Sequence, residues 1–129
     1  MKSGTKIIDI GTRLVTSGIF GYSAFLKLTA APPAVHIFQR IGMEPGGRYS
    51  IAALEIIAIV LLLIPKTAWR GAILGMVIML GAIGVHIITN EFDVLGDGGL
   101  MFASAIVVFF SCISILVYQA DMESELSSD

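Results

Sequence analysis

The chain has 129 residues, of which 56% are hydrophobic and only 14% are charged. Soluble domains usually carry about 25% charged residues, so this composition is typical of a membrane protein and argues against a soluble one. A net charge of −2 lacks the basic excess that nucleic-acid binding requires. The one cysteine, Cys112, excludes an intrachain disulfide and a dithiol mechanism.

Four segments are apolar enough to span a bilayer, which takes about 17–25 residues each. In chain order we place them at residues 7–31, 49–64, 68–89 and 99–118, and the short second span can begin a turn earlier. Prolines at 32, 33 and 65 end the first two spans, because proline has no N–H to donate. Lipid tolerates no open strand edge. We therefore expect an all-α protein, a membrane four-helix bundle threaded up-down-up-down, as a single domain over residues 1–120.

Two shorter segments lie outside these spans. Residues 33–43 are too few to cross a bilayer, and their apolar positions alternate with His36, Gln39 and Arg40. This pattern predicts a short helix between the first two spans that lies along the outer interface or caps the mouth of the bundle. Residues 121–129 form an acidic tail, which we expect to be solvated or disordered.

The first segment resembles a secretory signal in having two lysines before an apolar stretch. Asp9, Arg13 and Lys27 interrupt that stretch, so we expect a retained helix. The basic residues then predict the orientation, since cytoplasmic segments carry the excess of lysine and arginine. The side of the termini carries five of them: Lys2, Lys6, Arg13, Lys66 and Arg70. An even number of spans therefore places both termini in the cytoplasm.

Three ionisable residues inside the spans, Lys27, Glu55 and His86, fall on three different helices. The first and third spans reach Lys27 and His86 about one turn before their outer ends. The second span starts outside and meets Glu55 roughly 10 Å down, at about 1.5 Å per residue. The threading therefore predicts one polar cluster in the outer half of the bundle.

Helical spacing predicts which faces turn inward. Residues three and four apart on the first span form a mostly polar stripe, and those on the third are small at the inner end and polar at the outer end. The first stripe is Asp9, Arg13, Thr16, Phe20, Ser23 and Lys27; the second is Gly71, Gly75, Met79, Ala82, His86 and Asn90. The spacing of Gly71 and Gly75 suits close helix approach.

Each polar residue has a structural and a functional interpretation. Lys27 either snorkels to the head groups or pairs with Glu55, which is too short to snorkel and, as an intramembrane carboxylate, is functional by default. His86 makes either a structural hydrogen bond between helices or a titratable group in a site. One histidine and one carboxylate are too few ligands to predict a metal site. Asp9 and Arg13 form the i, i+4 ion pair of a helix.

The order of these features resembles the DoxX-like family of small four-helix membrane proteins. The run Gly21–Leu28 looks like the lysine-bearing end of that family's first helix, and residues 53–56 resemble its glutamate-bearing second helix. Residues 69–72 and the later His86 fit its third helix. The resemblance covers residues 12–118.

The resemblance implies a bacterial or archaeal inner-membrane protein with Lys27, Glu55 and His86 as the family-like polar residues. The family takes its name from a subunit of a thiosulfate:quinone oxidoreductase, and some relatives are linked to redox homeostasis. This sequence lacks paired histidine ligands, cysteine clusters and a GxGxxG loop, so no haem, flavin or iron–sulfur cofactor is evident. Redox chemistry would need a quinone or a partner's carrier.

Three functional hypotheses remain open. The first is an accessory or binding subunit in the bilayer that holds a small amphipathic ligand, a quinone or a lipid, in the outer half of the bundle. Its ligand-binding residues would be Lys27, Glu55, His86, Tyr22, Ser23 and Asn90. The second is a membrane enzyme, a quinone-linked oxidoreductase component or lipid isomerase, with Glu55 and His86 as acid and base. The third is a structural scaffold that forms a homo-oligomer or joins a redox partner protein.

Overall fold

The computed structural model describes residues 2–128 of the chain. In order along the chain the elements are α1 (Lys2–Leu28), α2 (Pro32–Arg40), α3 (Gly46–Leu63), the 3-10 turn η1 (Pro65–Thr67), α4 (Ala68–Thr89) and α5 (Leu100–Ser128). Met1 and Asp129, the outermost residues of the predicted domain and tail, lie outside the described residues.

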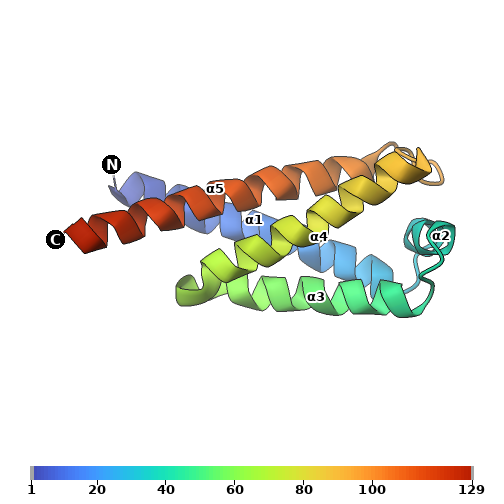
Figure 1. Ribbon diagram of the computed structural model, residues 1–129, viewed down its shortest axis with the longest axis horizontal. Helices are drawn as coiled ribbons and strands as arrows, with labels where there is room; N and C mark the ends of the chain where they lie inside the picture. Colours follow the sequence, from blue (N-terminus) through green and yellow to red (C-terminus); the bar gives the residue numbers. More distant parts are fainter. Residues whose placement is uncertain (1, 129) are drawn as a thin grey trace.

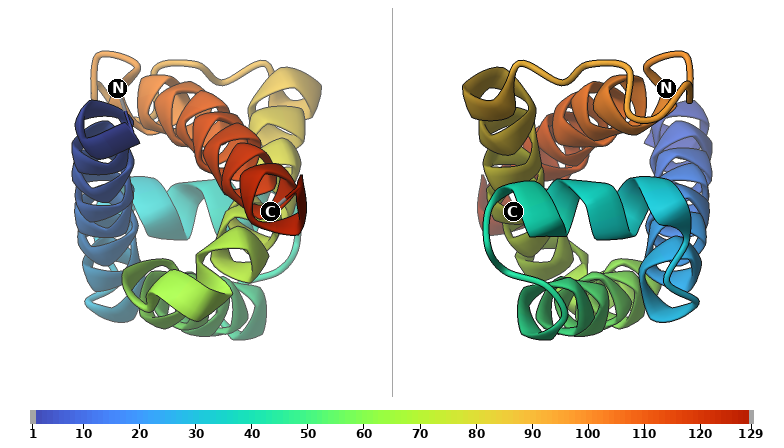
Figure 2. Two further views of the ribbon diagram at one scale, coloured as in Figure 1. Left: turned by 90° about the vertical axis from the view of Figure 1, so that its left-hand side faces the viewer. Right: turned by 90° about the vertical axis from the view of Figure 1, so that its right-hand side faces the viewer.

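The four long helices run alternately up and down, so both termini lie at one end of the molecule (Figure 1). Helix α1 packs against α3 and α5, and α4 packs against the same two helices. The short helix α2 lies across the opposite end of the bundle (Figure 2). The predicted all-α bundle with a short helix between its first two long helices is confirmed.

The protein is a multi-pass membrane protein with three to four candidate spans. Three are long and apolar enough by themselves, namely Gly46–Leu63, Pro65–Thr89 and Leu100–Leu126. The fourth is a bent pair, Gly4–Leu28 with Pro32–Arg40, in which the two helices meet at 78°. Charged side chains on α1 reduce its hydropathy, which is why that helix does not qualify alone.

Helix α1 ends three residues before the predicted Ala31. Ala30 adopts a left-handed conformation, with φ of 55°, and the N–H of Ala31 donates to the carbonyl of Leu26 at 2.9 Å. Pro32 and Pro33 then form the first turn of α2, where backbone N–H groups need no partner within the helix. The prolines therefore begin a new helix after a turn that has already ended α1.

The acidic tail, for which a solvated or disordered state was predicted, is helical where the structure describes it. Helix α5 continues to Ser128 because residues 118–128 contain no glycine or proline to stop it. Its acidic residues Asp121, Glu123 and Glu125 are exposed, as predicted for a solvated segment.

The bundle core is closely packed where α4 approaches its neighbours. A Cβ added at Gly75 would lie 2.7 Å from Cys112 Sγ on α5 and 3.1 Å from the ring of Phe20 on α1. One added at Gly71 would lie 2.8 Å from the backbone nitrogen of Leu62 on α3. Such distances are below van der Waals contact, so the predicted role of these two glycines in close approach is confirmed.

Candidate functional site

An ion pair between α1 and α3 forms the centre of the candidate site. Lys27 Nζ lies 3.1 Å from Glu55 Oε1 and donates a hydrogen bond to Oε2 at 3.4 Å. Glu55 is 0% exposed and Lys27 is 8% exposed. Lys27 therefore pairs with Glu55 and does not extend toward the surface, which confirms the pairing alternative.

Glu55 retains hydrogen-bonding capacity that Lys27 does not use. Lys27 Nζ also donates to Ser23 Oγ at 2.5 Å, one turn earlier on α1. Glu55 Oε1 lies 3.1 Å from Nζ but makes no well-aligned hydrogen bond with a described residue. A carboxylate oxygen can accept two hydrogen bonds, so this one, which lies beside a cavity, has capacity for a further donor.

Arg48 supports the lysine from the start of α3. It donates to the main-chain carbonyl of Lys27, which lies in the last turn of α1, and makes an ion pair with Glu44 at 2.8 Å. Arg48 is buried despite its charge, since both partners lie within reach. This role of Arg48 was not predicted from the sequence; the i, i+4 spacing of Glu44 and Arg48 was a signal for their ion pair alone.

His86 on α4 has a defined orientation. Its Nδ1 lies 2.7 Å from the main-chain carbonyl oxygen of Glu91, which can only accept, so Nδ1 carries the proton. In the neutral ring, Nε2 is then an acceptor, and no described residue donates to it. The hydrogen bond links α4 to the loop that follows it. The structural interpretation of His86 had predicted a hydrogen bond between two helices instead.

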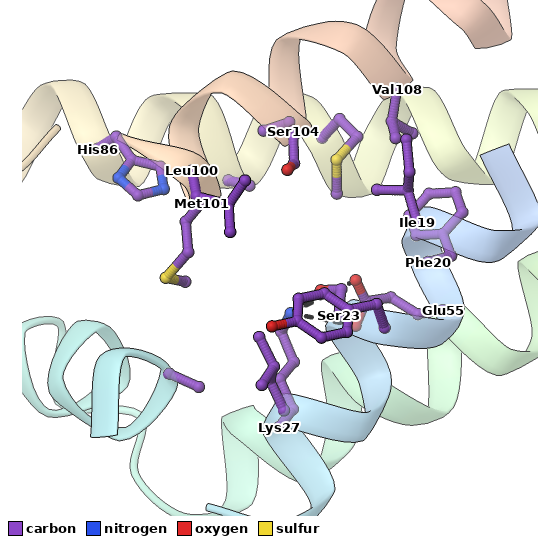
Figure 3. Close-up of a pocket in the computed structure, with 16 residues that line it drawn as sticks. Ile19, Phe20, Ser23, Lys27, Glu55, His86, Leu100, Met101, Ser104 and Val108 are labelled. Atoms are coloured by element: carbon purple, nitrogen blue, oxygen red, sulfur yellow. Dashed lines mark hydrogen bonds and ion pairs between the residues drawn. The ribbon is translucent and has the colours of Figure 1, made fainter. Parts of the chain in front are cut away.

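Two cavities meet at these residues. The smaller, about 90 Å³, lies among α1, α4 and α5, and the larger, about 320 Å³, lies among α2, α3 and α4. Both are lined by Lys27, Glu55, Met79, Ala82, His86 and Met101. In Figure 3, His86 and the Lys27–Glu55 pair face the opening from opposite walls.

Helix α2 closes the larger cavity and is fastened at its far end. Ile37 and Phe38 are buried and line that cavity. His36 Nε2 lies 2.6 Å from Glu91 Oε1, and Arg40 Nε lies 2.9 Å from Glu91 Oε2. The hydrogen bond from His36, then that from Arg40, lowers the pKa of Glu91 below its ordinary value, so the carboxylate stays ionised.

The remaining predicted site residues divide into two groups. Ser23 and Tyr22 line the smaller cavity, and Tyr22 is largely exposed. Asn90 lines neither cavity: it is an exposed, left-handed residue that ends α4, with its N–H directed at the carbonyls of His86 and Ile87. No hydrogen bond or ion pair joins Glu55 to His86 among the residues that the structure describes.

The comparison with known families decides the identity of the bundle. A match to the DoxX-like family extends over residues 12–114, which include Lys27, Glu55 and His86. The chain belongs to the DoxX-like family. No curated protein and no solved structure shows significant similarity to it.

This DoxX-like protein has a second buried ion pair at the other end of the bundle. Arg13 Nε lies 3.1 Å from Asp9 Oδ2, as the i, i+4 spacing predicted. Arg13 Nη1 also donates to the carbonyl of Leu62 at 2.9 Å, near the C-terminal end of α3. Neither residue lines a cavity, so this pair ties α1 to α3 and lies apart from the candidate site.

Metal ligands are not concentrated at either end of the DoxX-like bundle. Within residues 2–128, no group of three or more histidine, cysteine, aspartate or glutamate residues is arranged to hold a metal ion. The polar groups that line the smaller cavity are the buried Lys27–Glu55 pair, His86 and the hydroxyls of Tyr22, Ser23 and Ser104.

Proposed function

We propose that this DoxX-like protein is an accessory or binding subunit that holds a small amphipathic molecule, a quinone or a lipid, at the Lys27–Glu55–His86 cluster. The observation that carries the proposal is the fully buried Glu55, whose Oε1 accepts no hydrogen bond from the described residues and lines a cavity. Oε1 is paired with the Lys27 ammonium at 3.1 Å but retains acceptor capacity, so a ligand donor could add a hydrogen bond there.

The walls of the two cavities support an amphipathic ligand. The polar groups are few, contributed by α1, α3 and α4 and by Ser104 of α5, and the rest of the lining is apolar, as is usual for small-molecule sites. Lys27 can donate to a carbonyl of a headgroup, and His86 Nε2 can accept from a hydroxyl. The ligand's tail would lie beside Ile51 and Val77 of the larger cavity.

The route into the site is proposed to run from the lipid. Val77 lines the larger cavity and is 62% exposed, and Tyr22 lines the smaller and is also largely exposed. Both cavities therefore reach the apolar outer surface of the bundle, which the bilayer covers. A hydrophobic molecule could enter sideways without crossing water.

Filling the cavity tests this proposal. Ala82 lines both cavities, so Ala82→Leu should exclude the ligand while leaving the ion pair intact. The matched control is Ala103→Leu, at an exposed position on α5 that lines neither. After purification in native nanodiscs, mass spectrometry of the extracted lipids should show one species enriched with the wild type and with Ala103→Leu, and depleted with Ala82→Leu. Equal lipid profiles in all three would overturn the proposal.

We also propose that both termini lie in the cytoplasm of an inner membrane. The support is the basic residues at the end of the bundle where the termini lie, among them Lys6, Lys66 and Arg70. A green fluorescent protein fused after residue 129 should fluoresce in a bacterial host, and alkaline phosphatase fused there should be inactive. An active phosphatase fusion together with a non-fluorescent green fluorescent protein fusion would show that the C-terminus lies outside the cytoplasm, contrary to the proposal.

A further inference from the structure

We infer that the headgroup of the ligand is uncharged and donates two hydrogen bonds, one to Glu55 Oε1 and one to His86 Nε2. This inference rests on the proposed function and narrows it to a chemical class. The class is a molecule with two hydroxyl groups on one head, either a dihydroxy aromatic ring or a lipid with an aliphatic diol.

The hydrogen-bond inventory of the site requires donors. Glu55 Oε1 is buried and accepts no hydrogen bond from the described residues. His86 Nδ1 points to the carbonyl oxygen of Glu91, so its proton is committed there and Nε2 is left with a lone pair. A headgroup that only accepts, such as an oxidised quinone ring, would add no hydrogen bond at either atom.

The charges of the site exclude an ionic headgroup. Lys27 and Glu55 neutralise each other at 3.1 Å, so the cluster has no net charge to offer. An anion would meet the carboxylate of Glu55, and a cation would meet the ammonium of Lys27. Arg40, Arg48 and Glu91, which also lie at this end, are already in ion pairs. Burying a third charge among apolar walls would cost several kcal/mol without compensation.

The positions of the two acceptors require two separate donors. Glu55 is on α3 and His86 is on α4, and they face the opening from opposite walls (Figure 3). Both residues line both cavities, so a headgroup placed in the shared space faces both walls. A single hydroxyl group can donate to one of the two acceptors only, whereas a diol can donate to both.

Pairs of probes that differ only in donors test the inference. The aromatic arm compares 4-hexylresorcinol with its dimethyl ether, and the aliphatic arm compares 1-O-octylglycerol with its dimethyl ether; 4-hexylbenzoate is the anionic probe. Titration into protein-loaded nanodiscs, corrected for empty nanodiscs, should give one diol a Kd at least about tenfold lower than its ether and than the benzoate. The arm in which this difference occurs identifies the aromatic or the aliphatic source.

A variant of His86 distinguishes the loss of the ligand's hydrogen bond to Nε2 from a general loss of protein stability. The amide nitrogen of Asn overlaps the position of histidine Nδ1, so His86→Asn keeps a donor toward the Glu91 carbonyl and removes the Nε2 acceptor. It should weaken binding of the diol by about three- to tenfold and leave binding of the ether unchanged. The control, Ile88→Ala on the exposed face of α4, should change neither.

Nitrogen-15 NMR gives a direct signature of the hydrogen bond. The chain has two histidines, and His86→Asn assigns their signals. The His86 Nε2 resonance should move upfield when the diol binds, as a hydrogen-bonded imidazole nitrogen does, and should stay in place with the ether.

The outcomes separate the two proposals. If a diol and its ether bind equally and Ala82→Leu still abolishes both, the amphipathic site stands and the donor inference fails. Tighter binding of the benzoate also overturns the donor inference alone. If no probe binds and Ala82→Leu leaves the co-purified lipids unchanged, the proposed function fails and the inference fails with it.

Discussion

Lys27 and Glu55 depend on each other because both are buried in the interior of a membrane bundle. Each charge compensates the desolvation of the other, and Ser23 Oγ accepts a further hydrogen bond from the ammonium. Either charge alone would be uncompensated, so a substitution of one partner differs physically from a substitution of both.

Glu55→Gln should destabilise the bundle by about 3–5 kcal/mol, because it leaves the Lys27 ammonium buried and unpaired. The double variant Lys27→Met with Glu55→Met should recover most of that loss, since it removes both charges at similar volume. Unfolding in mixed detergent micelles measures both. A single variant as stable as the wild type would show that Lys27 reaches water by another route.

Helical spacing predicted some residues of the site and not others. The depth of Lys27, Glu55 and His86 along their helices was enough to predict that they share one level. The contact of Arg48 with the Lys27 carbonyl was not predictable, because it depends on where the start of α3 lies against the end of α1. Asn90 had the right spacing for the α4 stripe, but the helix ends there and the residue turns outward.

Among the elements, α4 packs closely against three other helices over part of its length. Its N-terminal half passes α1, α3 and α5 at distances that leave no room for a side chain at Gly71 or Gly75. Its C-terminal half opens onto both cavities through Met79, Ala82 and His86. One helix therefore combines close packing at one end with a cavity wall at the other.

Gly75→Ala should cost about 1–3 kcal/mol, because the new methyl group overlaps Cys112 Sγ and the ring of Phe20. The control is Gly84→Ala on the same helix, where nothing lies within 4 Å of the added carbon. That change should be neutral or stabilise by up to about 1 kcal/mol. Thermal unfolding of both variants checks the prediction, and equal midpoints would contradict the close approach of α4.

Helix α2 should loosen on acidification. The pKa of Glu91 is lowered from 4.5, first by the hydrogen bond from His36 and then by that from Arg40. A lowered pKa means that the stabilisation is fully present above pH 4.5 and is lost as the pH falls through the lowered value. Hydrogen exchange of α2, corrected for intrinsic rates, should accelerate below pH 4.5 in the wild type.

Glu91→Gln tests whether protonation of the Glu91 carboxylate causes this loosening. It should show fast exchange in α2 at neutral pH and little further change on acidification, because the titrating group is gone. Glu123→Gln, in the exposed end of α5, should behave as the wild type. Acid loosening that persists in Glu91→Gln would assign the effect to another carboxyl group.

On the scale of the whole molecule, the bundle is asymmetric along its length. The end with the termini is tied by Asp9, Arg13 and the carbonyl of Leu62, and the end with α2 encloses the cavities. Exposed apolar side chains surround the helices between these ends, which is the surface that a bilayer covers. The helical end of α5 extends past this packed region.

Truncation after Ala120 should leave the fold and the cavity intact. The removed segment is mostly exposed, with Leu126 71% exposed, and the match to the DoxX-like family ends at residue 114. Exposed terminal turns contribute little to stability. The midpoint of thermal unfolding should stay within about 4 °C of the wild type, a shift that corresponds to roughly 1 kcal/mol. A large loss of stability would show that the tail packs against the bundle.

The sequence by itself determined the membrane class, the threading, the inward faces of the first and third long helices and the shared level of Lys27, Glu55 and His86. These follow from hydropathy, helical periodicity and the alternation of direction, which are properties of local sequence. The tertiary structure was needed to show that Glu55 Oε1 and His86 Nε2 keep acceptor capacity, that Arg48 donates to the Lys27 carbonyl and that α2 is fastened through Glu91. Those features depend on rotamers and on the approach of segments far apart in the chain, which spacing along one helix cannot specify.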